Sequence, residues 1–144
     1  MKHNFSKDVK FYVCNVCGNL MIKLNDSGLT PQCCGRDMEE LAAGTTDGAM
    51  EKHVPIWEME GCKVMVTVGS EPHPMTPEHY IQWIIIETNK GYYCKHLEPT
   101  DEPEACIKLC KNEMVKNVYE YCNLHKLWKA EAKGDNYECP LCGI

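Results

Sequence analysis

Apolar residues in this 144-residue chain recur mostly at every second position, which is the period of a β-strand. Alternate valines over 64–68 mark one strand face, and the apolar, β-branched run 81–87 is typical of a buried strand. Glycines and prolines separate these runs and mark loops. The pattern therefore predicts an all-β chain with a β-sandwich of immunoglobulin size, and a β-barrel is the alternative. Shorter strands are expected near 10–13, 20–22, 92–93 and 115–119.

The pattern also divides the chain into three parts. Residues 1–40 carry two short strands and too little apolar mass to fold without a metal or a neighbour. Residues 41–131 begin with a linker rich in Ala, Gly and Thr and contain the sandwich strands. Residues 132–144 form a tail that ends in a CPLCG sequence.

Composition narrows the function. Fifteen Lys and Arg against 21 Asp and Glu give a net charge of −6, which argues against nucleic acid as a partner. The N-terminus lacks the apolar stretch of a secretory signal, and the apolar run 83–86 is too short to cross a membrane. We therefore expect a cytoplasmic protein without membrane contact.

Eleven cysteines are the most unusual feature of the composition. An odd number cannot close into intramolecular disulfides alone, and thiols stay reduced in the cytoplasm. So many cysteines in a reducing compartment indicate metal binding or redox chemistry.

Four of the cysteines have the spacing of a metal site. Cys14 and Cys17 form a CxxCG knuckle, and the adjacent pair Cys33 and Cys34 follows, also before a glycine. Two such pairs supply four thiolates for a tetrahedral site, which suits zinc or a single iron. The spacing does not separate the two metals and by itself leans towards zinc.

A second group of ligand-type residues lies in predicted loops. The sequence EKHVP places Glu51, Lys52 and His53 in succession, and a proline-bounded loop contains His73 and His79. A CNLH sequence adds a thiol and an imidazole, from Cys122 and His125. Loops at one end of a sandwich converge, so four imidazoles and one thiolate can meet there around an iron with one open position.

These motifs together resemble those of desulfoferrodoxin, the two-iron form of superoxide reductase. The resemblance covers about residues 8–131 through the CxxCG and vicinal cysteines, EKHVP, HPMTPEHYIQWI and CNLH followed by Leu-Trp-Lys. It implies a small desulforedoxin-like (rubredoxin-type) module followed by an immunoglobulin-like sandwich. It also favours iron over zinc at Cys14, Cys17, Cys33 and Cys34.

The resemblance further implies a role for each residue of the second group. His53, His73, His79 and His125 are implied as equatorial ligands of the second non-haem iron, and Cys122 as its axial thiolate. Glu51 is implied as the carboxylate that binds the open position in the oxidised resting state. Lys52 is implied as the cation that attracts superoxide and helps to protonate the product.

The implied activity is the one-electron reduction of superoxide to hydrogen peroxide, with rubredoxin or a similar protein as electron donor and a homodimer as the assembly. Three rival functions fit some of the same residues. They are a non-catalytic zinc-ribbon-like binding module, superoxide dismutation and electron transfer alone.

Two places depart from the family pattern. Lys126 follows His125 where the family usually has glycine, which is unfavourable if this position needs a left-handed backbone.

Cys139 and Cys142 supply only two of the four ligands of a tetrahedral site, so we expect no metal at the tail in isolation, although a dithiol/disulfide role is open. The remaining cysteines are expected to be core or strand thiols: Cys62, Cys94, Cys106 and Cys110.

Overall fold

The computed structural model describes residues 9–44, 50–131 and 139. The chain divides into two compact units, Met1–Ala42 and Ala43–Ile144. Apart from one four-residue helix, α1 (Met50–His53), the regular structure described is all β-strand, so the predicted fold class is confirmed. The described residues include no helix with the length and apolar character needed to cross a membrane.

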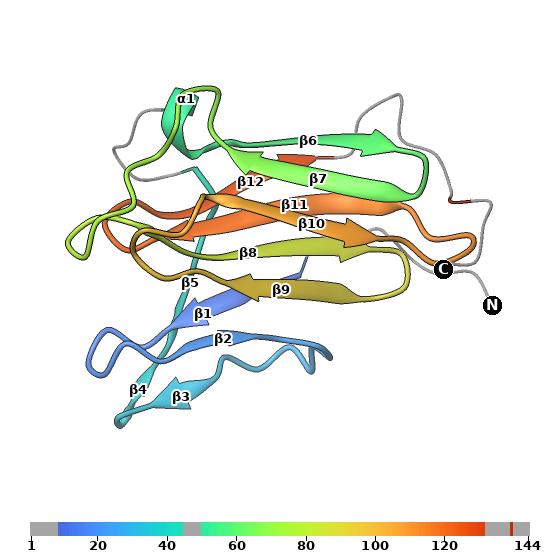
Figure 1. Ribbon diagram of the computed structural model, residues 1–144. Coiled ribbons are helices and arrows are strands. Elements are labelled where there is room, and N and C mark those ends of the chain that lie inside the picture. Colours follow the sequence, from blue (N-terminus) through green and yellow to red (C-terminus); the bar gives the residue numbers. More distant parts are fainter. Residues whose placement is uncertain (1–8, 45–49, 132–138, 140–144) are drawn as a thin grey trace. The chain divides into compact units, whose positions relative to one another are not determined.

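The first unit is built from two very small sheets (Figure 1). Its buried residues are few, and Tyr12, Cys14 and Met38 form their own cluster. Such a small apolar core offsets little of the entropy lost on folding, so the unit depends on its thiols for further stabilisation. One sheet has the order β2-β1-β5 and the other is the hairpin β3-β4; the strands are β1 (Phe11–Val13), β2 (Leu20–Ile22), β3 (Gln32–Cys33), β4 (Arg36–Asp37) and β5 (Glu39–Glu40).

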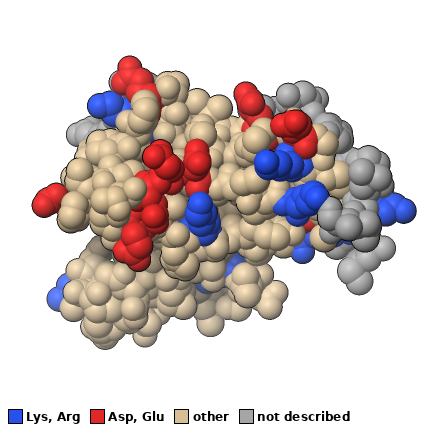
Figure 2. Space-filling view, viewed as in Figure 1, with Lys and Arg blue, Asp and Glu red and all other residues tan. Residues whose placement is uncertain are grey.

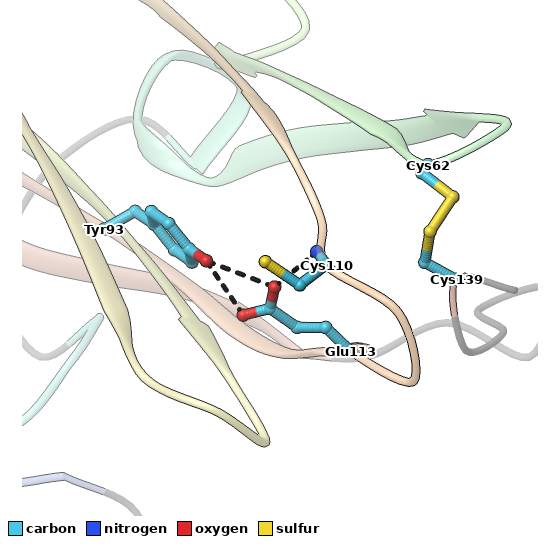
Figure 3. The surroundings of a disulfide bond; sticks show 5 residues. All are labelled: Cys62, Tyr93, Cys110, Glu113 and Cys139. Atoms are coloured by element: carbon cyan, nitrogen blue, oxygen red, sulfur yellow. Dashed lines mark hydrogen bonds between the residues drawn. A yellow bond between two sulfur atoms is a disulfide. The ribbon is translucent and has the colours of Figure 1, made fainter. Parts of the chain in front are cut away.

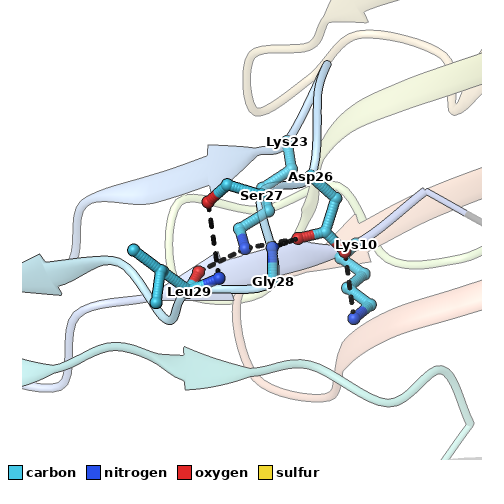
Figure 4. Close-up of polar contacts among 6 residues, drawn as sticks. All are labelled: Lys10, Lys23, Asp26, Ser27, Gly28 and Leu29. Carbon is cyan, nitrogen blue, oxygen red and sulfur yellow. Dashed lines mark hydrogen bonds and ion pairs between the residues drawn. The ribbon is translucent and has the colours of Figure 1, made fainter.

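A polar turn follows β2 (Figure 4). The Asp26 carboxylate accepts hydrogen bonds from Lys23 Nζ and from the Gly28 N–H, each at 2.8 Å, and lies 3.2 Å from Lys10 Nζ. The hydrogen bond from Lys23, followed by that from Gly28, lowers the pKa of Asp26 well below its ordinary value. Lys23 also donates to the Leu29 carbonyl, so one carboxylate and one ammonium organise the whole turn.

The second unit is a sandwich of two antiparallel sheets (Figure 1). The three-stranded sheet has the order β10-β7-β6, with β6 at Pro55–Glu60, β7 at Lys63–Val68 and β10 at Glu104–Lys108. The four-stranded sheet has the order β12-β11-β8-β9, with β8 at Ile81–Thr88, β9 at Tyr92–His96, β11 at Val115–Cys122 and β12 at Lys126–Glu131.

The inner faces of the two sheets form the core. The alternate valines of β7 are almost completely buried, as the period-two pattern predicts, and they pack with Ile84 and Ile86 of β8 and Val118 of β11. Trp57 of β6 joins this core, and its indole N–H donates to the Glu131 carbonyl at 3.3 Å. The inner faces thereby fix the register of the strands whose ends carry the histidine loops.

Some elements were not predicted from the sequence. Strands β6 and β10 lie at the edges of their sheet and expose many of their side chains, so they do not stand out in the sequence. Strand β12 is also an edge strand, and charged residues interrupt its apolar positions although only Glu131 is exposed. The helix α1 falls where a loop was expected.

One prediction about the cysteines is wrong. Cys62, expected as a core or strand thiol, forms a disulfide with Cys139 of the tail. Cys94 and Cys106 are strand thiols and Cys110 follows β10, and all three are free and exposed. Cys142 lies outside the described residues. Local sequence cannot reveal a pairing between residues 77 positions apart.

Lys126, at the start of β12, adopts the left-handed backbone conformation considered in the sequence analysis, with φ of 64°. A residue with a Cβ atom is strained by about 1–2 kcal/mol in this region, whereas glycine is not. We therefore expect Lys126→Gly to raise the free energy of unfolding by about 0.5–1 kcal/mol in urea denaturation, after allowing for the greater flexibility of the unfolded glycine chain.

Lys126→Ala is the matched control, because it removes the same charge but keeps the Cβ atom. It should leave the free energy of unfolding nearly unchanged. An equal gain in both variants would assign the effect to the charge rather than to the backbone.

Candidate metal centres

The four cysteines of the first unit come together at the ends of two turns. Their sulfur atoms lie within 4.8 Å of one another, with 3.6 Å between Cys17 and Cys33 and 3.9 Å between Cys33 and Cys34. Cys14 and Cys17 flank the knuckle after β1, and the Cys17 N–H points at the Cys14 sulfur at 3.5 Å. This arrangement matches the predicted tetrathiolate cluster.

The hairpin formed by β3 and β4 positions the vicinal cysteine pair. Cys33 ends β3 and Arg36 begins β4, so Cys34 and Gly35 are the two residues of the loop. Both have positive φ, 53° and 73°, which is the pattern of a type I′ turn. This hairpin, rather than a second CxxC knuckle, aims two adjacent thiols at one point.

The thiols of this cluster favour a bound cation. Hydrogen bonds from the backbone of Cys17 and Val16 lower the pKa of Cys14 to about 6. Hydrogen bonds with the thiols of Cys17 and Cys14 raise the pKa of Cys34 to about 12, because they stabilise its protonated form. A cation can replace these shared protons among the four sulfurs, so the donor set fits iron or zinc.

The second centre lies at one end of the sandwich and draws on four segments. His53 ends α1, His73 and His79 belong to the loop between β7 and β8, Cys122 ends β11, and His125 lies in the turn before β12. The ligand atoms of His53, His79, Cys122 and His125 lie within 4.8 Å of one another. His73 adjoins this group, with its Nε2 3.2 Å from Nε2 of His53.

The four imidazoles form a closed ring. Successive ring centroids are 4.7 Å apart from His53 to His73, 4.7 Å from His73 to His79, 5.2 Å from His79 to His125 and 4.6 Å from His125 back to His53. The His53–His79 diagonal is 6.4 Å. These lengths are close to those of a square, and the buried Cys122 sulfur lies 3.8 Å from His125 Nδ1.

The hydrogen bonds around the ring leave nitrogen lone pairs at its centre. His73 Nδ1 donates to the Pro74 carbonyl at 2.7 Å, which leaves its Nε2 without a proton and directed at His53. Nε2 of His79 is buried and makes no hydrogen bond among the described residues. Bare nitrogen atoms in such close contact fit a shared cation, since a buried lone pair without a partner is unfavourable.

Burial favours the neutral, metal-binding form of His73 and His79. Burial, with smaller contributions from the neighbouring imidazoles, lowers the pKa of His73 to about 4. The pKa of His79 is also lowered, first by burial and then by His125 and the charge of Lys52. Burial raises the pKa of the Cys122 thiol, so a cation is needed to hold a thiolate there.

Residues without metal-binding side chains hold this centre in place, and the sequence analysis did not identify them. The Asn123 amide donates to the Glu78 carbonyl at 2.9 Å and accepts from the Tyr80 N–H at 2.9 Å. These two bonds hold the backbone on both sides of His79. The Trp128 ring stacks on His53 with centroids 4.9 Å apart, and its N–H donates to the His125 carbonyl at 3.0 Å. Their only signal in the sequence was their position inside the CNLH and Leu-Trp-Lys motifs.

Glu120 is a third residue that the sequence analysis missed. It lies two positions before Cys122 on the same strand, and its side chain is completely buried. Both carboxyl oxygens lack a hydrogen-bond partner among the described residues, and burial raises the pKa of Glu120 to about 9. At neutral pH we therefore expect the Glu120 carboxyl to be neutral.

The other two predicted site residues lie in α1. Lys52 is half-buried and precedes His53 directly, which agrees with its influence on His79. The backbone of Glu51 lies in the same helix, but its side chain is outside the described residues.

Comparisons with known proteins agree with this architecture. Residues 45–131 match the family model described as Desulfoferrodoxin. Desulfoferrodoxins of Syntrophotalea carbinolica and Nitratidesulfovibrio vulgaris are 42% and 46% identical to the chain, covering 88% and 85% of it and 98% and 96% of themselves. The crystal structure of the superoxide reductase from Treponema pallidum superposes with a TM-score of 0.73 at 36% identity, covering 87% of this chain and all of that one. With a four-cysteine cluster and a His/Cys cluster, consistent with two iron ions, the chain belongs to the desulfoferrodoxin family of superoxide reductases.

Proposed function

We propose that this protein reduces superoxide to hydrogen peroxide at the ring formed by His53, His73, His79 and His125 above Cys122. The observation that carries the proposal is the closed square of four imidazoles with a buried thiol beside it. Four histidine nitrogens and one cysteine sulfur would give an iron ion five ligands and leave room for one small ligand more. A structural zinc site would use four ligands and be closed.

The reaction consumes one electron and two protons for each superoxide. An iron ion held by these five residues would supply the one-electron redox chemistry, with a donor protein as the source of the electron. The chain contributes the ligand geometry, the buried thiolate and the local charge. Glu51 is proposed as the carboxylate that occupies the open position in the resting state, which agrees with its place two residues before His53.

Local charge matters here because the protein as a whole is anionic. The net charge is −6, and a cluster of acidic side chains is visible on the left of the face shown in Figure 2. Superoxide is therefore repelled at long range and needs a positive group near the ring. Lys52 is proposed for this role, and its proximity is supported by its electrostatic effect on His79.

The four-cysteine cluster is proposed to hold the other iron, at Cys14, Cys17, Cys33 and Cys34. A rubredoxin-like protein is proposed as the electron donor, and a homodimer in the cytoplasm as the working form. These three proposals rest on the family resemblance.

We expect Lys52→Ala to slow the second-order reaction with superoxide and to weaken its dependence on ionic strength, because the attractive charge is lost. Pulse radiolysis at several salt concentrations measures both effects. Lys63→Ala is the control, since Lys63 is exposed at the far end of β7 and carries the same charge. Equal rates in all three proteins would exclude the steering role of Lys52.

We expect Asn123→Ala to weaken iron binding at the histidine ring by about 10- to 100-fold, because the loop around His79 loses both of its amide hydrogen bonds. Competition with a chelator, followed in the visible spectrum, measures the affinity.

Asn89→Ala is a closely matched control for Asn123→Ala. The Asn89 amide also donates to a carbonyl, that of Asn112 at 3.0 Å, and accepts from the backbone N–H of Met114 at 2.9 Å, but it lies at the other end of the sandwich. Loss of iron in both variants would indicate a general loss of stability rather than a local effect on the ring.

Metal analysis of the purified protein tests the whole proposal. We expect two irons per chain with two distinct visible spectra, one of a tetrathiolate site and one of thiolate-to-iron charge transfer at the ring. Zinc alone would contradict the proposal and favour a zinc-ribbon-like binding module. The yield of peroxide per superoxide consumed then separates a reductase, expected to give one, from a dismutase, expected to give one half.

A further inference from the structure

The Cys62–Cys139 disulfide (Figure 3) joins the turn after β6 to the tail, so it lies at the opposite end of β6 from His53. Cys62 follows Gly61 in the tight turn between β6 and β7, whereas His53 precedes β6. The six residues of β6 span about 20 Å. The disulfide is therefore too far from the ring to take part in iron binding there.

Both cysteines are held in place by backbone hydrogen bonds as well as by the disulfide. The Cys139 N–H donates to the Glu113 carbonyl at 2.9 Å, and the Cys139 carbonyl accepts from the Asn112 N–H at 2.6 Å. The Cys62 carbonyl accepts from the Leu109 N–H at 2.7 Å. All three bonds go to the segment between β10 and β11, so the two sulfurs stay close to each other when the disulfide is reduced.

The pairing is selective. The other eight cysteines that the structure describes are free thiols, including the exposed Cys94, Cys106 and Cys110. The match to the family model ends at residue 131, so Cys139 lies beyond it. Disulfides in a reducing compartment are usually transient and catalytic or redox-sensing. In sequence, Cys139 begins a CxxC motif, a spacing used in thiol–disulfide exchange.

The two cysteines differ in access to solvent. Cys62 is partly exposed, whereas Cys139 is completely buried in the core between the sheets. A thiol that meets a small oxidant must be accessible, while the thiol that resolves the first product needs only to be adjacent. This asymmetry assigns the first step to Cys62 and the second to Cys139.

We propose that Cys62 and Cys139 are a second redox site that reduces hydrogen peroxide, the product that the proposed function supplies. The Cys62 thiolate attacks one peroxide oxygen, the O–O bond breaks, and a sulfenic acid and one water form after protonation. The Cys139 thiol then displaces the sulfenic hydroxyl as a second water, which leaves the disulfide. Two thiols and one peroxide thus give one disulfide and two waters, and an external dithiol protein restores the thiols by exchange.

The test uses the complete iron-loaded protein, reduced with dithiothreitol and then freed of it. Hydrogen peroxide is added directly, so the result does not depend on whether the iron site turns over superoxide, which is assayed separately. Peptide mass mapping before and after peroxide should show that the Cys62 and Cys139 peptides become joined with the loss of two hydrogens. Cys94→Ser is the control and should behave like the unaltered protein.

Two variants separate the steps. In Cys139→Ser the sulfenic acid at Cys62 should accumulate and be trapped by dimedone, because its partner is missing. In Cys62→Ser we expect no dimedone adduct at the buried Cys139 and one peroxide fewer consumed per chain than in the unaltered protein.

Three results would overturn the proposal. A disulfide that dithiothreitol does not open in the folded protein would be a permanent structural link. Peroxide oxidation of the pair no faster than that of Cys94, Cys106 and Cys110 would show no dedicated chemistry. A third metal ion in the reduced protein that is lost in Cys139→Ser would make the pair part of a metal site.

Discussion

The structure of the sandwich unit depends on one electrostatic constraint at its loop end. Ring nitrogens of neighbouring imidazoles lie only 3.0–3.2 Å apart, beside a thiol that burial keeps protonated in the absence of a cation. A cation between these atoms would bind their lone pairs and stabilise the thiolate form of the cysteine. Bringing these ligand atoms together is unfavourable without a metal ion and favourable when one is bound. Folding and metal binding are therefore coupled.

This constraint explains why the ring is attached to a sandwich and not to a single loop. His53, Cys122 and His125 lie at or next to the ends of α1, β11 and β12, and the strands are fixed by an inner face of buried valines and isoleucines. His73 and His79 instead lie within a loop. The hydrogen bonds of Asn123 attach this loop to the turn that follows Cys122. The first unit positions its four thiols with a much smaller core, because a knuckle and a two-residue hairpin loop hold them.

Much of this arrangement was predictable from the sequence, for physical reasons that differ between its parts. Alternation in β7 and the apolar run of β8 report burial directly, so these strands were predicted correctly. The ligand-type residues stood out because histidines and cysteines recur in short motifs within loops, and the family resemblance gave each a role. Edge strands such as β6 and β10, the supporting contacts of Asn123 and Trp128, and the buried Glu120 were missed because they depend on neighbours distant in sequence. The pairing of Cys62 with Cys139 was missed for the same reason, since nothing around either residue indicates a partner 77 positions away.

The two ends of the sandwich can carry separate chemistry because the strands between them are rigid. β6 connects His53 to Cys62, and β11 connects the Asn112–Glu113 turn, which binds Cys139, to Cys122. When the disulfide changes state, hydrogen bonds hold the turns near it. The buried side chains in the middle of the sandwich keep the register of both strands. We therefore expect the ligand ring to stay in place when the disulfide opens or closes. A small neutral product such as hydrogen peroxide can reach the other end by diffusion, without any structural coupling between the two sites.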